Sequence, residues 1–188
     1  LAALTTDQIA ALSTTGIKGL SRSSVAALST TQIMALSQSQ ISALTTSQAS
    51  AISAEQIQVM NATQIQGFST PNIMAMTATT IMGMDTKALA SLTATQLKNL
   101  TGTALSALSS TQMAALSTTQ LKTLTTAQIP QLNSTDISEL TTTELLALNS
   151  TQIRAITSTA IQGLTTELVS ALPPSLLSAL SSNAIAAL

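Results

Sequence analysis

The chain has no cysteine and no histidine among its 188 residues, and Phe68 is its one aromatic residue. Disulfides, thiol nucleophiles, zinc sites built from cysteine and histidine, and imidazole acid–base chemistry are therefore excluded. A single aromatic side chain also excludes a platform on which nucleic-acid bases could stack. We expect no enzyme and no bound cofactor from this composition.

Charge is also scarce. Charged residues make up 7% of the chain and the net charge is −1, whereas soluble domains usually carry about a quarter. A basic surface for nucleic acid is absent, and so is a polybasic patch for anionic lipid. No apolar run is long enough to span a membrane, because Ser, Thr or another polar residue interrupts it every few positions. We expect neither a nucleic-acid partner nor a membrane span.

A regular feature remains: every eighth position from Leu4 to Leu188 holds a large apolar residue. A strict period of this kind indicates a tandem array of small structural units. A half-repeat at residues 1–4 precedes 23 octads at residues 5–188, with the consensus [ST]-T-T-Q-[IL]-x-A-L. We predict a single repeat array over residues 1–188. Because the first residue lies in mid-repeat, we expect residues 1–188 to be a segment of a longer chain.

Position one of the octad predicts the start of a helix. It is Ser, Thr, Asn or Asp in every octad except the one that begins at Pro173, and these side chains accept hydrogen bonds from the free N–H groups of a first helical turn. Position four is most often Gln, which completes a capping box. The predicted N-caps include Thr5, Ser13, Ser29, Asn61, Asp85, Thr93, Ser117 and Asn149.

Each octad therefore predicts a helix of about one and a half turns over positions two to seven, followed by an extended residue at position eight. Ordering eight residues costs on the order of 12 kcal/mol, and burying one Leu and one Ile returns roughly 1.5–3 kcal/mol each. An octad must therefore stack on its neighbours, which predicts an all-α solenoid of very short capped helices. Predicted core residues at positions five and eight include Ile9, Leu12, Ile33, Leu36, Ile65, Phe68, Leu97, Leu100, Leu121, Leu124, Ile153 and Ile156.

Two other architectures fit the period less well. In one continuous helix the apolar row would drift by about 80° per octad and would spiral round every face. A β-solenoid stays open as the alternative, since Thr and Ile favour strands. It would place positions five and eight on opposite faces, however, and the frequent Ala, Gln, Leu and Met favour helix.

Two details bear on the geometry of the unit. Position seven is small, so neighbouring backbones could approach closely there, and its four glycines fall in even-numbered octads, which hints at two octads per superhelical turn: Gly19, Gly67, Gly83 and Gly163. Pro130 at position six conflicts with a helix interior, because proline lacks the N–H and its ring crowds the preceding turn. Pro71 and Pro174 lie in first turns, where proline is tolerated.

Candidate sites are few, and a structural role is favoured for each. A methionine group could bind Cu(I) through thioethers, but methionine also fills cores: Met74, Met76, Met82 and Met84. The one acidic group could bind Ca²⁺ or transfer protons, but a solvated or capping role is favoured: Asp136, Glu139 and Glu144. Basic residues at position six mark that position as solvent-facing: Lys18, Lys98, Lys122 and Arg154.

Four sites match the N-glycosylation pattern, at Asn61, Asn99, Asn133 and Asn149. The pattern arises readily from the octad itself, because three of these residues are cap positions with Thr two residues later. We therefore favour incidental matches over four designed glycan acceptors.

The octads STTQIMAL (29–36) and STTQLKTL (117–124) resemble tandem arrays of very large bacterial surface and secreted adhesin-like proteins. This resemblance covers the whole chain and implies an extracellular or cell-surface stalk. We therefore expect a structural spacer or filament-forming segment that self-associates through ends without polar caps. The alternative is an adhesin-type binding module that presents a Ser/Thr-rich face to glycan, ice or a host surface.

Overall fold

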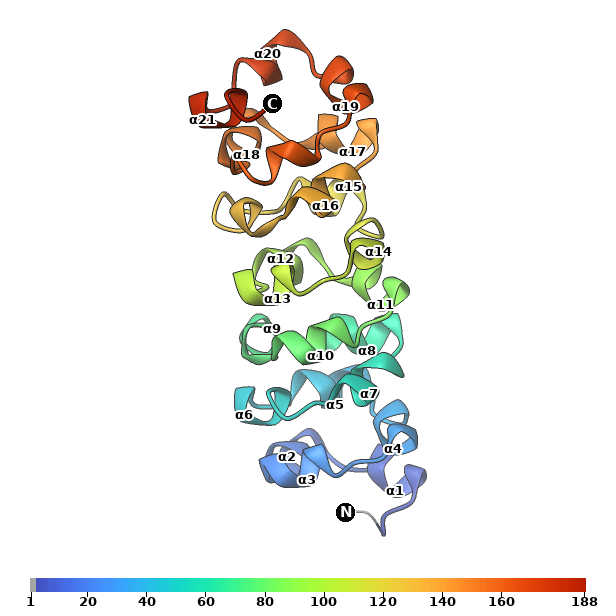
Figure 1. The fold of residues 1–188 in the computed structure, drawn as a ribbon. Helices are drawn as coiled ribbons and strands as arrows, with labels where there is room; N and C mark the ends of the chain where they lie inside the picture. Colours follow the sequence, from blue (N-terminus) through green and yellow to red (C-terminus); the bar gives the residue numbers. More distant parts are fainter. Residues whose placement is uncertain (1–2) are drawn as a thin grey trace. The chain divides into compact units, whose positions relative to one another are not determined.

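The computed structural model describes residues 3–188, and within this range the chain is helical without a strand (Figure 1). The half-repeat at residues 1–4 lies partly outside the described residues. The chain divides into two compact units, Leu1–Leu100 and Thr101–Leu188. A single array over all 23 octads stays a prediction.

The first unit holds twelve α-helices: α1 (Thr6–Ala10), α2 (Thr14–Lys18), α3 (Arg22–Ala26), α4 (Thr30–Met34), α5 (Gln38–Ser42), α6 (Thr46–Ala49), α7 (Ala54–Gln58), α8 (Ala62–Gly67), α9 (Thr70–Ala75), α10 (Ala78–Met82), α11 (Thr86–Ser91) and α12 (Ala94–Lys98). The second unit holds α13 (Gly102–Ser106), α14 (Ser110–Met113), α15 (Thr118–Leu121), the 3₁₀ helix η1 (Ile129–Gln131), α16 (Ser134–Ser138), α17 (Thr142–Ala147), α18 (Ser150–Ala155), the 3₁₀ helix η2 (Ile161–Gly163), α19 (Thr166–Ala171), α20 (Pro174–Leu177) and α21 (Ser182–Ile185).

Each octad from residue 5 onward contains one of these helices, so the prediction of an all-α solenoid of very short helices is confirmed. The β-solenoid alternative is wrong for the described residues. It fails because the side chain at position one closes a helical turn before a strand could form. Position four then supplies the second half of the cap.

The octad containing α4 shows the local geometry. Ser29 is extended (φ −69°, ψ 160°) and its side chain accepts from the backbone N–H of Gln32, while Ala35 ends the helix with φ −78° and ψ −12°. Position eight is then extended, as at Phe68 with φ −65° and ψ 128°. No described residue has a positive φ. The chain therefore turns between helices through two extended residues, positions eight and one, without a left-handed glycine.

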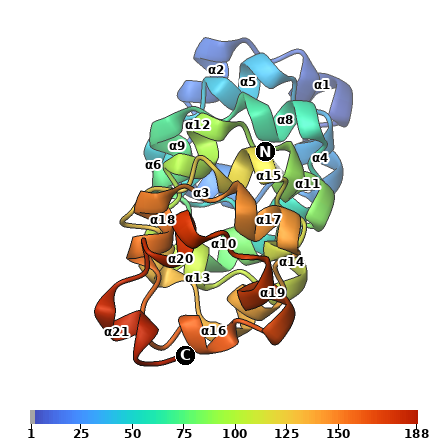
Figure 2. The same cartoon turned by 90° about the horizontal axis from the view of Figure 1, so that it is seen from above.

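Three octads, or 24 residues, make one superhelical turn within each unit. In the first unit α1 packs on α4, α2 on α5 and α3 on α6, and the series continues to α9 on α12. In the second unit α14 packs on α16, α15 on α17 and α16 on η2, again three octads apart. In Figure 2, α2, α5 and α8 lie one beside the next.

The hint of two octads per turn was therefore wrong. Three of the four glycines at position seven, Gly67, Gly83 and Gly163, closely approach the octad three before them, whereas Gly19 meets only its own octad. A Cβ on Gly83 would lie 2.6 Å from the Cα of Ala54, and one on Gly163 would overlap the carbonyl oxygen of Ser134. Backbones of successive turns thus meet at this position, as a small residue there allows.

The core is built from positions five and eight. Position five is at most 1% exposed in the first twenty octads, from Ile9 through Ile65 to Ile161. In the last three octads it is half-buried at Val169 and exposed at Leu177 (40%) and Ile185 (51%). In those octads no later turn within the chain covers position five.

The proline at position six is accommodated by a change of helix type. Pro130 lies in the 3₁₀ helix η1, where the backbone N–H groups of Gln131 and Leu132 bond to carbonyls three residues earlier. The α-helical bond that Pro130 cannot donate is therefore not required. Pro71 and Pro174 lie in the first turns of α9 and α20, as predicted.

Candidate functional site

The eight predicted N-caps lie at helix starts, and each side chain accepts a hydrogen bond from the backbone of the first turn. Thr5 accepts from Gln8 and Ser13 from Gly16, while Asp85 accepts from Ala88 at 2.7 Å. Ser29, Asn61, Thr93, Ser117 and Asn149 each form a complete capping box with the Gln at position four.

The predicted core residues lie in the interior with one exception. Leu12 is half-buried. It lies in the first superhelical turn, so a neighbouring turn packs on one side of it and not on both. The others are at most 3% exposed: Ile9, Ile33, Leu36, Ile65, Phe68, Leu97, Leu100, Leu121, Leu124, Ile153 and Ile156.

The Gln at position four has a second role that the sequence analysis missed. The Oε1 of Gln40 accepts from the N–H of Ser37 at 2.7 Å and so closes the capping box. Its Nε2 donates to the carbonyls of Ile9, Ala10 and Leu12 at 3.0, 3.2 and 2.8 Å. Gln40 therefore joins the start of its own helix, α5, to the end of α1. Helix α1 directly precedes α2, on which α5 packs. We call this arrangement the Gln clamp.

The Gln clamp recurs with a fixed offset of 28 and 31 residues. Gln48, Gln56, Gln64 and Gln96 repeat it in the first unit, with Nε2–oxygen distances of 2.7–3.1 Å to carbonyls at these offsets. In the second unit Gln152 donates to Leu121 and Leu124 at 3.0 and 2.9 Å. These amides are buried, so each bond is formed away from water and is correspondingly hard to lose.

Shorter polar side chains reach the same carbonyl row. The Nδ2 of Asn72 donates to the carbonyl of Leu44 at 3.0 Å, and the Oγ1 of Thr80 donates to that of Ile52 at 2.8 Å. A signal for this role was present in the sequence. A capping box needs only an acceptor, which Glu supplies as well as Gln, yet position four is Glu once, at Glu144. The preference for Gln over Glu indicates that a donor is favoured at this position.

The methionine group is divided between the core and the surface. Met76 and Met84 are 4% and 2% exposed, whereas Met74 and Met82 are 53% and 54% exposed. A core role is therefore wrong for Met74 and Met82, which occupy the solvent-facing position six. The basic residues at position six are exposed, as predicted: Lys18, Lys98, Lys122 and Arg154.

The acidic group does not come together as a metal site. Among residues 3–188, no three acidic side chains are close enough to hold a metal ion. Asp136 caps α16 together with Asn133 but is only 3% exposed, so a solvated role is wrong for this residue. Burial raises its pKa, and the N–H of Asn133 lowers it by less. The pKa of exposed Glu55 is lowered by its own backbone N–H and by Ser53.

The sequons lie at caps with their amide oxygens engaged. Asn61, Asn133 and Asn149 accept first-turn N–H groups through Oδ1. Asn99 instead donates from Nδ2 to the carbonyl of Thr95 at 2.8 Å.

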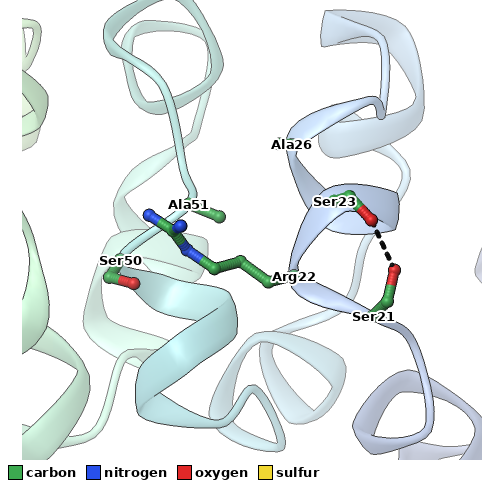
Figure 3. Close-up of a pocket in the computed structure, with 6 residues that line it drawn as sticks. All are labelled: Ser21, Arg22, Ser23, Ala26, Ser50 and Ala51. Carbon is green, nitrogen blue, oxygen red and sulfur yellow. Dashed lines mark hydrogen bonds between the residues drawn. The ribbon is translucent and has the colours of Figure 1, made fainter.

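A surface groove of about 520 Å³ lies between α3 and the end of α6 in the first unit. Figure 3 shows Arg22 extended across it toward Ser50 and Ala51, with the Ser21 and Ser23 hydroxyls 2.9 Å apart on the other side. The groove offers hydroxyls and one guanidinium but no acid, base or nucleophile in a catalytic arrangement. It can hydrogen-bond a polar ligand and nothing in it points to a reaction.

Comparison with known families gives one match: residues 1–38 match the model of the ALTTAQ repeat. Residues 3–8 read ALTTDQ, so this motif spans the end of one octad and the start of the next. No curated protein matches the chain. The match supports a tandem-repeat protein and carries no link to bacterial adhesins. No described helix is both long and apolar enough to cross a membrane.

Proposed function

We propose that this chain is a structural spacer, a stalk or filament segment of an extracellular or cell-surface protein, without a catalytic role. The Gln clamp is the observation that carries the proposal. It recurs in both units with the same offsets and joins a helix start to the preceding turn by buried bonds, so further turns of this kind can be added without a change of design.

The contacts within each unit fit a spacer because they are local. Packing joins octads three apart, and stability in such repeats is a sum over neighbouring units. Few charges lie on the surface, so salt has little to screen. A spacer of this kind would keep its length across changes of ionic strength.

Self-association is the second part of the proposal. The last two octads expose the position-five side chains Leu177 and Ile185, which earlier octads bury, and Leu188 at position eight is 55% exposed. Such apolar side chains favour a covering partner. A further turn of the same repeat has the apolar register to cover them, and filaments would result where that turn belongs to another copy.

A whole-turn deletion tests the spacer. Removing residues 37–60 deletes three octads and leaves the repeat in phase. A spacer predicts unchanged helical circular dichroism per residue and a shorter particle in small-angle X-ray scattering and electron microscopy. Removing four fewer residues, 37–56, is the matched control, because it breaks the octad register. Equal loss of structure in both deletions would contradict the proposal.

A binding surface is the second candidate, because exposed hydroxyls are regularly arranged. Three octads per turn place consecutive octads on different sides, so a one-sided row is found at 24-residue steps. Position three gives such a row in three successive turns of the first unit, with exposed hydroxyls at Thr15, Ser39 and Thr63. Repeated hydroxyls on one side could recognise glycan, ice or a host surface.

The row is tested by replacing Thr15, Ser39 and Thr63 with Ala and measuring adhesion to glycan arrays, ice and host cells. The matched control replaces Ser23, Thr31 and Ser39, which lie on three different sides. Loss of adhesion in the first variant alone supports a binding face. Unchanged adhesion in both variants would leave the spacer as the function.

A further inference from the structure

Asp136 occupies position four of its octad, the position that holds the Gln clamp in other octads. Among the described residues it is the one carboxylate at this position that is buried. Gln and Asn side chains at this position, and Thr80, donate to the carbonyl 28 residues earlier. Gln side chains also reach the carbonyl 31 residues earlier. For Asp136 these offsets select the carbonyls of Leu108 and Leu105. An ionised carboxylate has no proton to donate to either.

The carboxylate is only half used in the capping box. Its Oδ2 accepts from the N–H of Asn133 at 2.9 Å, and no hydrogen bond involves its Oδ1. Because no fully buried side-chain oxygen or nitrogen of the described residues lacks a partner, this Oδ1 keeps a narrow contact with solvent. A small ion could reach it by that route.

No positive side chain compensates Asp136. Helices α14 and η2 pack on α16, and neither carries a charged residue. The segment from Leu105 to Leu108 is also uncharged, and the nearest charged residue along the chain is Glu139, which is exposed at the C-cap of α16. The groups expected beside this buried carboxylate, 28 and 31 residues earlier, are carbonyl oxygens. Burying its charge there is costly unless a cation or a proton joins it.

We propose that Asp136, together with the carbonyl oxygens of Leu105 and Leu108, binds Ca²⁺. Carboxylate and carbonyl oxygens are the ligands that Ca²⁺ prefers, and waters complete its shell of six to eight. In the Gln clamp one nitrogen lies within hydrogen-bond distance of two or three converging carbonyls, as Gln152 does with Leu121 and Leu124. The ion takes the place of that donor. With one carboxylate the affinity is expected in the millimolar range, as in weak extracellular sites.

Glu144 is the natural comparison, since it is the other carboxylate at position four. Its Oε2 accepts from the N–H and hydroxyl of Thr141 at 2.7 and 2.8 Å, and the residue is partly exposed. Its longer side chain is not enclosed as Asp136 is, so solvent can compensate its charge. We therefore expect no calcium dependence from Glu144.

The test uses the whole chain and titrates CaCl₂ by isothermal calorimetry and thermal melting at pH 7. The proposal predicts one site and a rise in Tm of about 3–5 °C at tenfold saturation. Asp136→Asn should abolish both, and Glu144→Gln should leave both unchanged. Asn at position four folds normally at Asn72, so the first variant is expected to retain the helical signal.

Three outcomes overturn the proposal. One is the absence of any calcium response in the unmodified chain. Another is an equal response in Asp136→Asn, which would indicate a general effect of the salt. The third is a rise in Tm on acidification without any calcium response, which would assign the compensating role to a proton. NaCl at matched ionic strength and MgCl₂ serve as the controls for charge and size.

Discussion

Two regions of the molecule form the same kind of short helix in each octad but differ in the side chain at position four. Residues 29–68 contain five successive octads with a buried Gln at position four, whereas residues 157–188 contain four octads with Ala or Leu there. Both regions form short α-helices with a side-chain cap, except α20, whose N-cap Pro173 forms no side-chain cap hydrogen bond. Ser37 caps α5 in the first region, and Thr165 caps α19 in the second. The cap and the apolar register therefore suffice to form a helix.

The difference lies in how the turns are joined. In residues 29–68 each Gln donates to carbonyls of the preceding turn, as Gln64 does to Ile33 and Leu36 at 2.8 Å. In residues 157–188 position four has no donor, and turns meet through apolar contacts and the close approach at Gly163. The comparison separates two tasks: a polar side chain at position one caps the start of a helix, and a Gln at position four bonds that helix to the preceding turn.

The largest expected effect comes from removing the donor within residues 29–68. Gln56→Glu keeps the acceptor of the capping box but places a charge against the carbonyls of Val25 and Leu28, which now lie 3.1 and 2.8 Å from Nε2. We expect a loss of about 3 kcal/mol in the free energy of unfolding, from urea denaturation followed by circular dichroism.

Gln8→Glu is the control for this substitution. Gln8 is exposed and forms the capping box with Thr5, with no earlier turn beneath it. Its change is expected to stay within about 0.5 kcal/mol. If both variants lost the same amount, the bonds to the preceding turn would contribute nothing and the comparison of the two regions would fail.

A smaller effect is expected where residues 157–188 rely on close backbone approach. Gly163→Ala would place a Cβ in overlap with the carbonyl oxygen of Ser134, so the turns must move apart. We expect a loss of about 1–3 kcal/mol from such overpacking. Gly16→Ala is the matched control, since its Cβ would meet nothing closer than 3.5 Å. It should stabilise its helix by up to about 1 kcal/mol.

Asp136→Asn tests position four through its pH dependence. The pKa of Asp136 is raised from its ordinary value of 3.8, chiefly by burial. The folded state therefore holds the proton more tightly than the unfolded state, so the stability from protonated Asp136 is full below the ordinary value and is lost as the pH rises through the folded pKa.

At neutral pH without calcium, Asp136→Asn supplies a donor, as Asn72 does to Leu44, and should stabilise the fold by about 1 kcal/mol. Melting curves between pH 3 and pH 7 are the measurement. The gain should shrink as the pH falls, because the carboxylic acid then donates as well. A constant gain at every pH would show that the charge of Asp136 does not matter.

Much of the fold follows from the sequence because its signals are local. The cap at Ser29 and the buried Ile33 act within one octad, so period and side-chain chemistry are enough to predict them. The helix type is the limit of this approach, since Pro130 lies in the 3₁₀ helix η1 but η2 is also a 3₁₀ helix and contains no proline.

The number of octads per turn was not predictable in the same way. It depends on how Gly83 meets Ala54 and how Gln40 reaches Leu12, which are contacts between residues 28 or 29 positions apart. A pattern read within single octads has no information on these contacts. Within single octads, the preference for Gln over Glu at position four was the one signal of these contacts between turns. The burial of Asp136 likewise depends on the turn packed against it.

The smallest effect is expected from adding a Gln clamp where residues 157–188 lack one. Ala160→Gln keeps the cap from Thr157 and, by the offset of 28 residues, points an amide at the carbonyl of Leu132. One additional buried hydrogen bond should stabilise the second unit by about 0.5–1.5 kcal/mol, measured by urea denaturation. Ala160→Leu is the control for added volume without a donor. Ala160 is fully buried, so a loss shared by both variants would mean that the approach at Gly163 has already filled the space of the amide. A gain from Gln alone would show that the two regions differ only in the residue at position four.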